Sequence, residues 1–329
     1  MKAFRYIRPR DCAQAAEALR GASNALLHAG GTDLLGRMKE RVDEPDALVA
    51  LLDAKGMQAI RIEEDGAITI GARATLAAIA EAPAVLKFLP SLAQAAGHAA
   101  SPQLRRRATL GGNIAQHTRC GYYRMESFPC LKRGAESCPV RAEGAVQDNA
   151  GIFGNGVCAS AHPSSVAPVL GALDAEILVR GPKAERVILF EDFWADPKRG
   201  RAGDTRLGPT DVIRAVRFPA RDERQHVGNA EVRQKKAFDW ALASCSVRYE
   251  MENDKITDVR VWFGSLAPAP WRAIKAEAVL KGGACSDEAA AKAAAAALAD
   301  ATPLPGSTYK VQLAKVVLKR ALAAARKGA

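Results

Sequence analysis

Four of the seven cysteines in this 329-residue chain fall within residues 120–158, at Cys120, Cys130, Cys138 and Cys158. They come directly after a glycine motif, Thr109-Leu110-Gly111-Gly112-Asn113. The total is odd and the four are clustered, so disulfide bonds are less favoured than a metal site. A metal centre would force this segment to fold around one point. The sequence therefore predicts a metal centre beside a cofactor-binding loop.

The spacing of the four cysteines, C-x9-C-x7-C-x19-C, is neither that of a C-x2-C zinc site nor that of a ferredoxin. Four thiolates can hold zinc or a 4Fe–4S cluster, and the spacing does not choose between them. Buried or unpaired cysteines are the alternative without metal. His117 and His162 flank the segment and are further potential ligands. The isolated cysteines Cys12, Cys245 and Cys285 are interpreted as small core residues.

A second glycine motif, Ala29-Gly30-Gly31-Thr32-Asp33-Leu34, lies between a predicted strand and a predicted helix. Glycines allow a positive φ and let backbone N–H groups approach phosphate oxygens closely. In the motif at residues 109–114, Thr109 and Asn113 can add side-chain hydrogen bonds. Each motif alone is also compatible with a tight turn. Together they favour one shared dinucleotide, and neither matches a Rossmann G-x-G-x-x-G fingerprint or a P-loop.

Composition excludes several classes of function. Charged residues make up 25% and hydrophobic ones 48%, as in a folded globular protein. The net charge is +11, but aromatic residues are only 5% and do not alternate with basic ones, which argues against nucleic-acid binding. No apolar run approaches the 18 or so residues of a membrane span. The amino terminus lacks the apolar region of a signal peptide, so we expect no export signal on this chain.

Hydrophobic periodicity predicts two differently organised regions, with a boundary near residue 222. The first region begins with strands and helices in alternation. The second has antiparallel strands that turn at Asn253-Asp254, a loop interrupted by Pro268 and Pro270, and helices. The predicted helices cover residues 12–20, 34–40, 76–81 (with Thr75 as N-cap), 91–100, 166–173, 287–300 and 312–326, and the predicted strands 24–28, 47–52, 67–71, 176–179, 247–250 and 256–263.

Several motifs together resemble one known family. The chain resembles the FAD-binding medium subunits of the xanthine dehydrogenase/molybdenum hydroxylase family, and the resemblance covers nearly its whole length. The residues that carry it are 29–35, Met38-Lys39, Ser101, Arg105, 108–113, 171–175, 263–267 and 270–272. The surroundings of the cysteines, at 118–123, 129–133, 137–138 and 158–164, are most similar to the 4Fe–4S-containing subunit of bacterial periplasmic-type aldehyde oxidoreductases.

The resemblance implies an α+β fold with two domains. Residues 1–222 would form a two-part FAD-binding domain of the PCMH/vanillyl-alcohol-oxidase-like type. Its subdomains would cover about 1–57 and 58–222, with the 4Fe–4S insertion at 118–158. Residues 223–329 would form a small α+β carboxy-terminal domain with a three-stranded antiparallel sheet and helices.

The resemblance also implies a function. The chain would be the FAD and 4Fe–4S electron-transfer subunit of a heterotrimeric molybdenum-containing aldehyde oxidoreductase. It would take electrons from a small 2Fe–2S subunit, while a large subunit with the molybdenum cofactor oxidises the substrate, and pass them through FAD to an external acceptor. The alternatives are the FAD subunit of a 4-hydroxybenzoyl-CoA reductase-like enzyme and, in another class, a zinc-stabilised binding module without a redox role.

The resemblance assigns binding roles but no catalytic residue. The four clustered cysteines would hold the 4Fe–4S cluster. The FAD would be bound by Ala29, Gly30, Gly31, Thr32, Asp33, Leu34, Ser101, Thr109, Gly111, Gly112, Asn113 and Ile213.

Two positions depart from the family pattern. Ser164-Ser165 stands where many members have an aspartate, and Glu231 replaces a lysine found in some. These changes put a carboxylate contact to the flavin and the use of NAD in doubt, and leave quinones, dyes, ferredoxin or oxygen as possible acceptors. The compartment would be the cytoplasm, or the periplasm by co-export with a partner that carries a twin-arginine signal.

Overall fold

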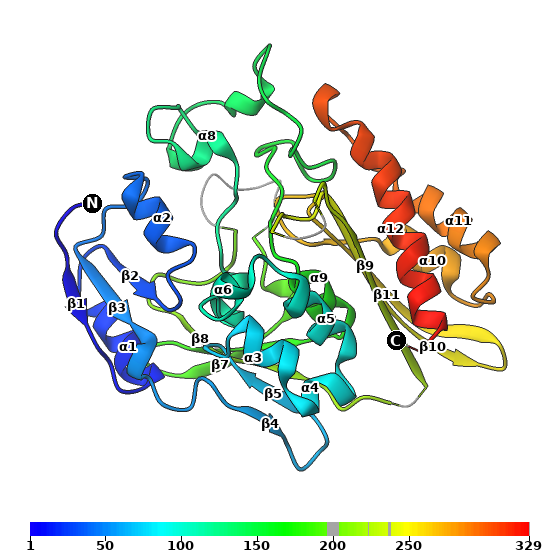
Figure 1. Ribbon diagram of the computed structural model, residues 1–329, viewed down its shortest axis with the longest axis horizontal. Coiled ribbons are helices and arrows are strands. Elements are labelled where there is room, and N and C mark those ends of the chain that lie inside the picture. The colour runs from blue at the N-terminus through cyan, green and yellow to red at the C-terminus, as the bar shows by residue number, and fades with distance from the viewer. Residues whose placement is uncertain (196–203, 223, 236–237, 329) are drawn as a thin grey trace.

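The computed structural model describes residues 1–195, 204–222, 224–235 and 238–328. Three sheets follow one another along the chain, and helices pack against each of them (Figure 1). The amino-terminal sheet and the carboxy-terminal helices lie at opposite ends of the molecule, with the second sheet between them (Figure 1). The fold is α+β, as predicted.

The first sheet is parallel, with strand order β1-β3-β2, and contains β1 (Arg5–Ile7), β2 (Ala25–His28) and β3 (Ala47–Ala50). Helix α1 (Cys12–Arg20) connects β1 to β2 and begins where the Asp11 carboxylate accepts a hydrogen bond from the Gln14 backbone N–H at 2.8 Å. Helix α2 (Leu34–Lys39) connects β2 to β3. The predicted alternation of strands and helices is confirmed here, although the predicted strand at 47–52 ends in a 3-10 turn over Leu51–Asp53.

The second sheet is antiparallel and has five strands in the order β4-β5-β8-β6-β7. Helices lie over one side of it in Figure 1, and the larger hydrophobic core fills the space beneath them. The strands are β4 (Ile60–Ile62), β5 (Ile68–Gly71), β6 (Glu176–Arg180), β7 (Glu185–Leu189) and β8 (Val212–Phe218). The helices of this region are α3 (Leu76–Glu81), α4 (Pro83–Phe88), α5 (Pro90–His98), α6 (Pro102–Arg105), α7 (Leu110–Ile114) and α9 (Ala167–Ala172), and a 3-10 turn covers Phe190–Asp192.

Residues 118–158, called the cysteine segment below, contain little regular structure. They include α8 (Gly121–Arg124) and two 3-10 turns over Leu131–Arg133 and Pro139–Arg141. In Figure 1 the segment lies at the top of the molecule, beside the first turn of the last helix. The Tyr309 hydroxyl at the start of that helix donates a hydrogen bond to the Asp148 carbonyl at 2.8 Å. The cysteine segment is therefore in contact with the carboxy-terminal region.

The carboxy-terminal sheet has four antiparallel strands in the order β12-β11-β10-β9, and the prediction of three strands was wrong. The additional strand, β12 (Trp271–Arg272), pairs with Phe263 and Trp262 of β11. It lies in the segment predicted to be a loop because of Pro268 and Pro270. Those prolines cannot donate to a ladder, but the two residues that follow them can.

The remaining strands and helices of this region form the second hydrophobic core. The turn at Asn253-Asp254 is confirmed, and both residues have a positive φ, at 49° and 59°. The elements are β9 (Gln225–Val232), β10 (Ala243–Glu252), β11 (Lys255–Gly264), α10 (Ile274–Leu280), α11 (Asp287–Ala297) and α12 (Tyr309–Arg326), with a 3-10 turn over Pro305–Ser307.

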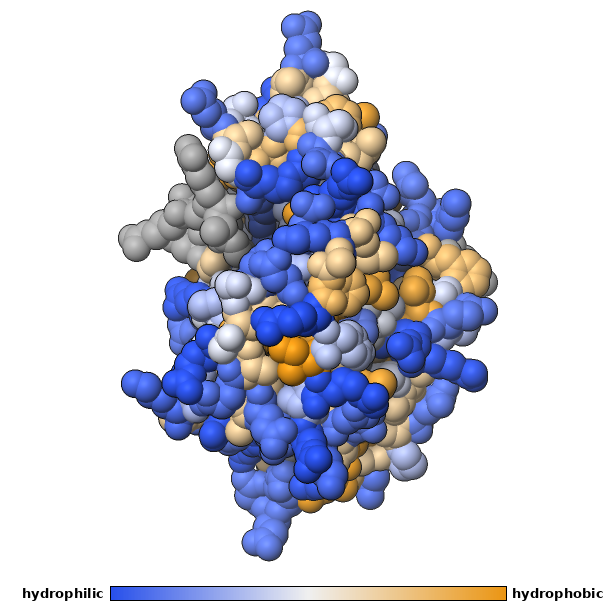
Figure 2. Space-filling model, turned by 90° about the vertical axis from the view of Figure 1, so that its left-hand side faces the viewer, coloured by the Kyte–Doolittle hydropathy of each residue, from blue (hydrophilic) through white to orange (hydrophobic). Residues whose placement is uncertain are grey.

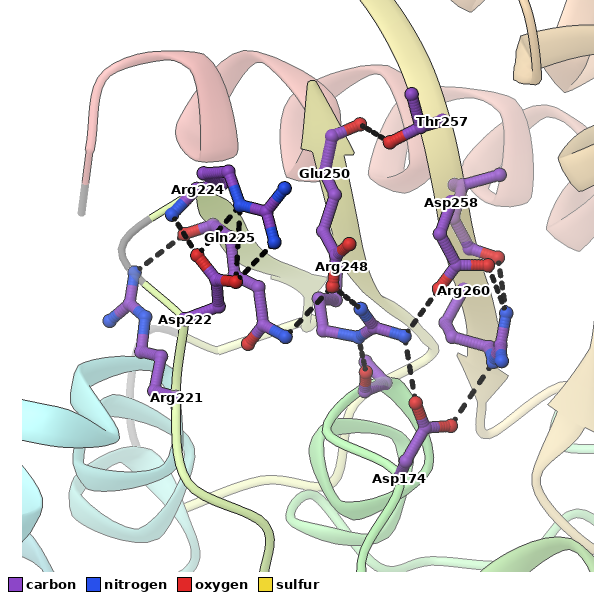
Figure 3. A network of polar contacts seen from close by, with 12 residues as sticks. Asp174, Arg221, Asp222, Arg224, Gln225, Arg248, Glu250, Thr257, Asp258 and Arg260 are labelled. Carbon is purple, nitrogen blue, oxygen red and sulfur yellow. Dashed lines mark hydrogen bonds and ion pairs between the residues drawn. The ribbon is translucent and has the colours of Figure 1, made fainter. Parts of the chain in front are cut away.

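A buried arginine joins the carboxy-terminal sheet to helix α9. The Arg248 guanidinium on β10 donates to the Ala172 carbonyl at 3.0 Å and to the carboxylates of Asp174 and Asp258 at 2.7 Å each (Figure 3). Only 4% of Arg248 is exposed. Arg260 reinforces the contact by donating to Asp174 at 3.1 Å. These bonds hold the carboxy-terminal sheet against the end of α9.

Figure 2 views the molecule from the side on which β1 and α2 lie in Figure 1. This face is mostly hydrophilic, and small hydrophobic patches near its middle are interrupted by charged and polar residues.

Candidate functional site

The two glycine motifs line one cavity of about 400 Å3, although some eighty residues separate them in the sequence. The predicted site residues Thr32, Ser101 and Asn113 are not among its lining residues. The predicted site residues that do line the cavity are Ala29, Gly30, Gly31, Asp33, Leu34, Thr109, Gly111, Gly112 and Ile213.

The first motif requires its glycines for close backbone contacts. A Cβ atom on Gly30 would lie 1.9 Å from the Arg107 carbonyl oxygen, so the loop packs directly on the backbone just before the second motif. Gly31 has φ +75°, and a Cβ atom there would meet Leu35 Cδ1 at 2.8 Å and His28 Nε2 at 3.0 Å. Both positions therefore require a residue without a side chain.

The second motif was predicted to be a phosphate-binding loop or, alternatively, a tight turn, and it forms the short helix α7. The Thr109 hydroxyl caps the helix by accepting a hydrogen bond from the Gly112 backbone N–H at 3.3 Å. The Gly111 backbone N–H donates to the Ala72 carbonyl at 2.8 Å, and a Cβ atom on Gly111 would lie 2.9 Å from the Ala72 Cβ atom. The second motif is therefore seated on the chain that follows β5.

The side chains of Asn113 and Ser101 form hydrogen bonds within the protein and do not line the cavity. The Ser164 hydroxyl donates to Asn113 Oδ1 at 2.5 Å and accepts a hydrogen bond from the Ala167 backbone N–H at 3.0 Å. Ser164 thus connects α7 to the first turn of α9, at the position where an aspartate was expected in the family. The Ser101 hydroxyl caps α6 by accepting from the Leu104 backbone N–H at 3.2 Å.

Two buried groups in or beside the cavity were not predicted. Arg73 lines the cavity and is 9% exposed, and its guanidinium donates to the Ala54 carbonyl at 3.2 Å. Burial lowers the pKa of Arg73, and the negative charge of Asp53 partly offsets this effect. His28 lies next to the first motif, and its Nδ1 atom is buried and has no hydrogen-bond partner among the residues that the structure describes. Neither residue stands in a recognisable motif, so only their burial identifies them.

Asp33 of the first motif binds the cysteine segment. Its carboxylate lies 2.5 Å from the Arg124 guanidinium and 3.2 Å from that of Arg119, and it accepts a hydrogen bond from the His117 backbone N–H at 3.2 Å. Burial alone would raise the pKa of Asp33, but Arg124, Arg37 and Arg119 lower it below its usual value. Asp33 is therefore an anion held by arginines on both sides of Cys120.

Further hydrogen bonds and ion pairs stabilise the cysteine segment internally and against the rest of the protein. Arg133 donates to the backbone carbonyls of Tyr123, Met125 and Phe128, which closes the loop after α8. Lys132 forms a buried ion pair with Asp204. Burial would raise the pKa of Asp204, but His117 and Lys132 hold it well below its usual range.

The four clustered cysteines are close enough to influence one another's pKa values. Burial raises the pKa of the Cys120 thiol, and negative charge on Cys158 and Cys130 raises it further. Burial likewise raises the pKa of Cys158, with a contribution from Cys138, while Lys132 opposes it. All four thiols are free. Within the described part of the chain, no three His, Cys, Asp or Glu side chains are arranged to hold a metal ion. The donor chemistry fits an iron–sulfur cluster, but the thiol positions are not those of a closed site.

The flanking histidines have other surroundings. The His162 ring packs against Trp194 at 4.8 Å between ring centroids, and burial lowers the pKa of His162 to about 4. The His117 ring stacks on Tyr123 at 5.8 Å and places Nδ1 3.5 Å from an Asp204 carboxylate oxygen. Neither arrangement supports a role as metal ligand.

Glu231, the second departure from the family pattern, pairs with Arg233 at 2.6 Å and with His98 at 3.2 Å, so its carboxylate is already neutralised.

Comparisons with known families decide the assignment. The family described as the FAD binding domain in molybdopterin dehydrogenase matches residues 2–221, and the family described as the CO dehydrogenase flavoprotein C-terminal domain matches residues 230–325. The chain belongs to the family of FAD-binding medium subunits of xanthine dehydrogenase and CO dehydrogenase. It is thus a subunit of the molybdenum-containing oxidoreductase class, and the predicted family is confirmed.

Individual relatives of this FAD-binding family align over nearly their full length. The chain is 32% identical to the aldehyde oxidoreductase FAD-binding subunit PaoB of Escherichia coli K12, with 99% of each chain covered. It is 30% identical to the carbon monoxide dehydrogenase medium chain of Hydrogenophaga pseudoflava, covering 98% of this chain and 96% of the relative. A solved structure of carbon monoxide dehydrogenase from H. pseudoflava superposes with a TM-score of 0.77 at 28% identity, with 98% and 97% of the two chains covered.

No helix among the described residues of this FAD-binding subunit has the length and apolar character needed to cross a membrane.

Proposed function

We propose that this chain is the FAD and 4Fe–4S electron-transfer subunit of a molybdenum-containing aldehyde oxidoreductase. It would receive electrons from a small 2Fe–2S subunit and pass them through FAD to an external acceptor. The substrate aldehyde would be oxidised on a large subunit that carries the molybdenum cofactor. The observation that carries the proposal is the cavity lined by both glycine motifs, with the four-cysteine segment attached to its rim through Asp33.

The residues around the cavity fit a flavin dinucleotide. Gly30 and Gly31 remove side chains from one wall, and Gly111 and Gly112 do the same on the other. Arg73 offers a buried cation to an anionic group in the cavity. Bound there, FAD would supply the ability to accept and release one or two electrons. The protein would bind and orient the cofactor and shield it from water.

The cysteine segment supports an iron–sulfur centre by its donor chemistry. Its thiols influence one another's pKa values, while the three remaining cysteines lie elsewhere in the fold. Lys132, buried beside Cys158, favours the thiolate form that a cluster needs. A cluster bound by Cys120, Cys130, Cys138 and Cys158 would draw the four thiols together. It would also order a segment that otherwise contains few hydrogen bonds of helices or sheets.

The choice of aldehyde as substrate comes from the likeness to PaoB, the FAD-binding subunit of an aldehyde oxidoreductase. The partner subunits are inferred from the family, in which carbon monoxide dehydrogenase has a medium chain that aligns with 98% of this chain. Family membership speaks against a zinc-stabilised binding module without a redox role. The 4-hydroxybenzoyl-CoA reductase alternative has no specific observation in its favour.

An absorption spectrum with metal and flavin analysis of the purified full chain tests the proposal. We expect one FAD, four irons and acid-labile sulfide per chain, with flavin bands superimposed on a broad iron–sulfur absorbance. Zinc in place of iron, or a colourless protein, would overturn the cluster assignment. Flavin without iron would leave the chain a family flavoprotein and remove only the proposed cluster.

A further inference from the structure

A second cavity, of about 420 Å3, lies between the cysteine segment and the carboxy-terminal domain. It shares no lining residue with the cavity of the glycine motifs. Apolar and aromatic side chains form most of its wall, among them Tyr122 and Phe128 of the cysteine segment and Trp240 from the loop before β10. A mostly apolar cavity of several hundred Å3 with a few polar groups has the character of a small-molecule site.

One polar group in this cavity is a buried cation without a carboxylate partner. Lys310 on α12 is 1% exposed, and its ammonium donates to the Ser265 carbonyl at 3.2 Å. No ion pair joins Lys310 to any carboxylate within the described residues. An ammonium group has three donors, so an acceptor within the cavity can take a further hydrogen bond. Burial lowers the pKa of Lys310 to about 8, which leaves most of the population charged at neutral pH.

Aromatic side chains line this cavity, and the Arg119 guanidinium lies over the Trp240 ring, 5.6 Å from its centroid. The Tyr122 and Phe128 rings meet edge to face, with 5.1 Å between their centroids. Phe128 and Trp240 are 38% and 54% exposed, so they stand where the cavity meets solvent. Such a wall favours a planar aromatic body, and Lys310 at the buried side favours an oxygen at the inner end of that body.

We propose that this cavity binds a quinone, with one ring oxygen accepting a hydrogen bond from the Lys310 ammonium. The ring would pack against Tyr122, Phe128 and Trp240. Cys120 lines the same cavity, so the quinone would lie next to a proposed ligand of the iron–sulfur cluster.

A role for the quinone as electron acceptor rests on the proposed function. Its reduction to a hydroquinone takes two electrons and two protons. The electrons would come from the reduced FAD, and the protons from Lys310 and from solvent at the open side.

Calorimetric titration of the oxidised full chain with duroquinone tests the binding without turnover. The duroquinone ring is fully substituted, so it does not alkylate the free thiols. Lys310→Met keeps most of the side-chain volume and removes the ammonium. We expect it to weaken duroquinone binding about tenfold or more, since a hydrogen bond to a charged group is worth roughly that factor. Lys319→Met, an exposed lysine on the same helix, is the matched control and should change Kd less than twofold.

Trp240→Ala removes a half-exposed wall residue that lies outside both hydrophobic cores, and should weaken binding several-fold even if Lys310→Met were to misfold. Absence of duroquinone binding, or equal affinity in Lys310→Met and wild type, would overturn the proposal. So would Lys310-dependent binding of 2,4,6-trimethylbenzoate without binding of duroquinone, because the site would then take an aromatic anion. Iron and flavin are measured on the titrated sample, so failure to bind duroquinone in a protein that holds both is distinct from failure of the spectral test above.

Discussion

The cavity lined by the two glycine motifs, proposed to hold FAD and called the flavin cavity below, lies beside the cysteine segment. The two are built in different ways. The cavity is defined by backbone, since Gly30 and Gly111 leave no room for a Cβ atom against Arg107 and Ala72. The cysteine segment is held by side chains, with Arg124 bound to Asp33, Lys132 bound to Asp204, and Arg133 bound to carbonyl groups. A backbone-built site exists before its ligand arrives, whereas the segment held by side chains depends on charge and, in the proposed function, on a metal cluster.

Among the variants below, Gly31→Val is expected to have the largest effect, and it acts on the flavin cavity. A β-branched residue at φ +75°, with contacts of 2.8 Å to Leu35 and 3.0 Å to His28, should cost roughly 3 kcal/mol and block the cavity wall. We expect the variant to lose its FAD, as measured by the flavin released on denaturation.

Gly36→Val is the matched control, because nothing lies within 4 Å of a Cβ atom at Gly36. It should keep its flavin. Normal flavin content in Gly31→Val would refute the assignment of this loop.

Cys138→Ser tests whether the cysteine segment can lose its ligand while the cavity keeps its own. We expect most of the iron to disappear and FAD to remain, because Cys138 does not line the flavin cavity. Iron and flavin are measured on the same sample. Cys285→Ser, an isolated cysteine far along the chain, is the control and should keep both. Unchanged iron in Cys138→Ser would contradict the cluster assignment.

Asp33→Asn breaks the tie between the two regions. Removing a mostly buried carboxylate leaves Arg119 and Arg124 without their anionic partner, while Arg37 keeps Asp43 at 3.0 Å, and should cost about 2–3 kcal/mol after allowance for partial exposure. The first thermal unfolding transition and the iron retained after purification both report this loss.

The effect should also depend on pH. The pKa of Asp33 is lowered in the folded protein, so its stabilisation is complete above the unfolded value of about 3.9 and is lost as the pH falls further. The difference between wild type and Asp33→Asn should therefore be constant near neutral pH and shrink below about pH 4. A difference that grew on acidification would contradict the ion-pair account.

A smaller effect is expected from Arg248→Met, which loosens the contact between the carboxy-terminal sheet and α9 (Figure 3). Its partners Asp174, Asp258 and Glu250 are partly exposed, so we expect a loss of about 2 kcal/mol with flavin content unchanged. Arg224→Met removes an exposed arginine from the network in the same figure and should leave the melting temperature unchanged. Equal effects of the two variants would show that burial of Arg248 is unimportant.

Local signals in the sequence predicted two helices of the amino-terminal region accurately. Helix α1 was predicted at its observed bounds, and α3 was predicted together with its cap, since Thr75 accepts a hydrogen bond from the Ala78 backbone N–H at 3.1 Å. Capping and periodicity act over a few residues, so they can be read from the chain directly. Strand β12 was missed because a strand of two residues has no periodicity of its own and exists only through its partner β11.

The sequence by itself determined the glycine motifs, the cysteine cluster and the family, because each is recognised from short stretches of consecutive residues. Only the tertiary structure decided that Asp33 would bind Arg124, 91 residues away, and that Arg73 and Lys310 would be buried cations lining two separate cavities. The reason is physical. A charge acquires its role from burial and from the partners that the fold brings to it, and neither is visible in the identity of the residue.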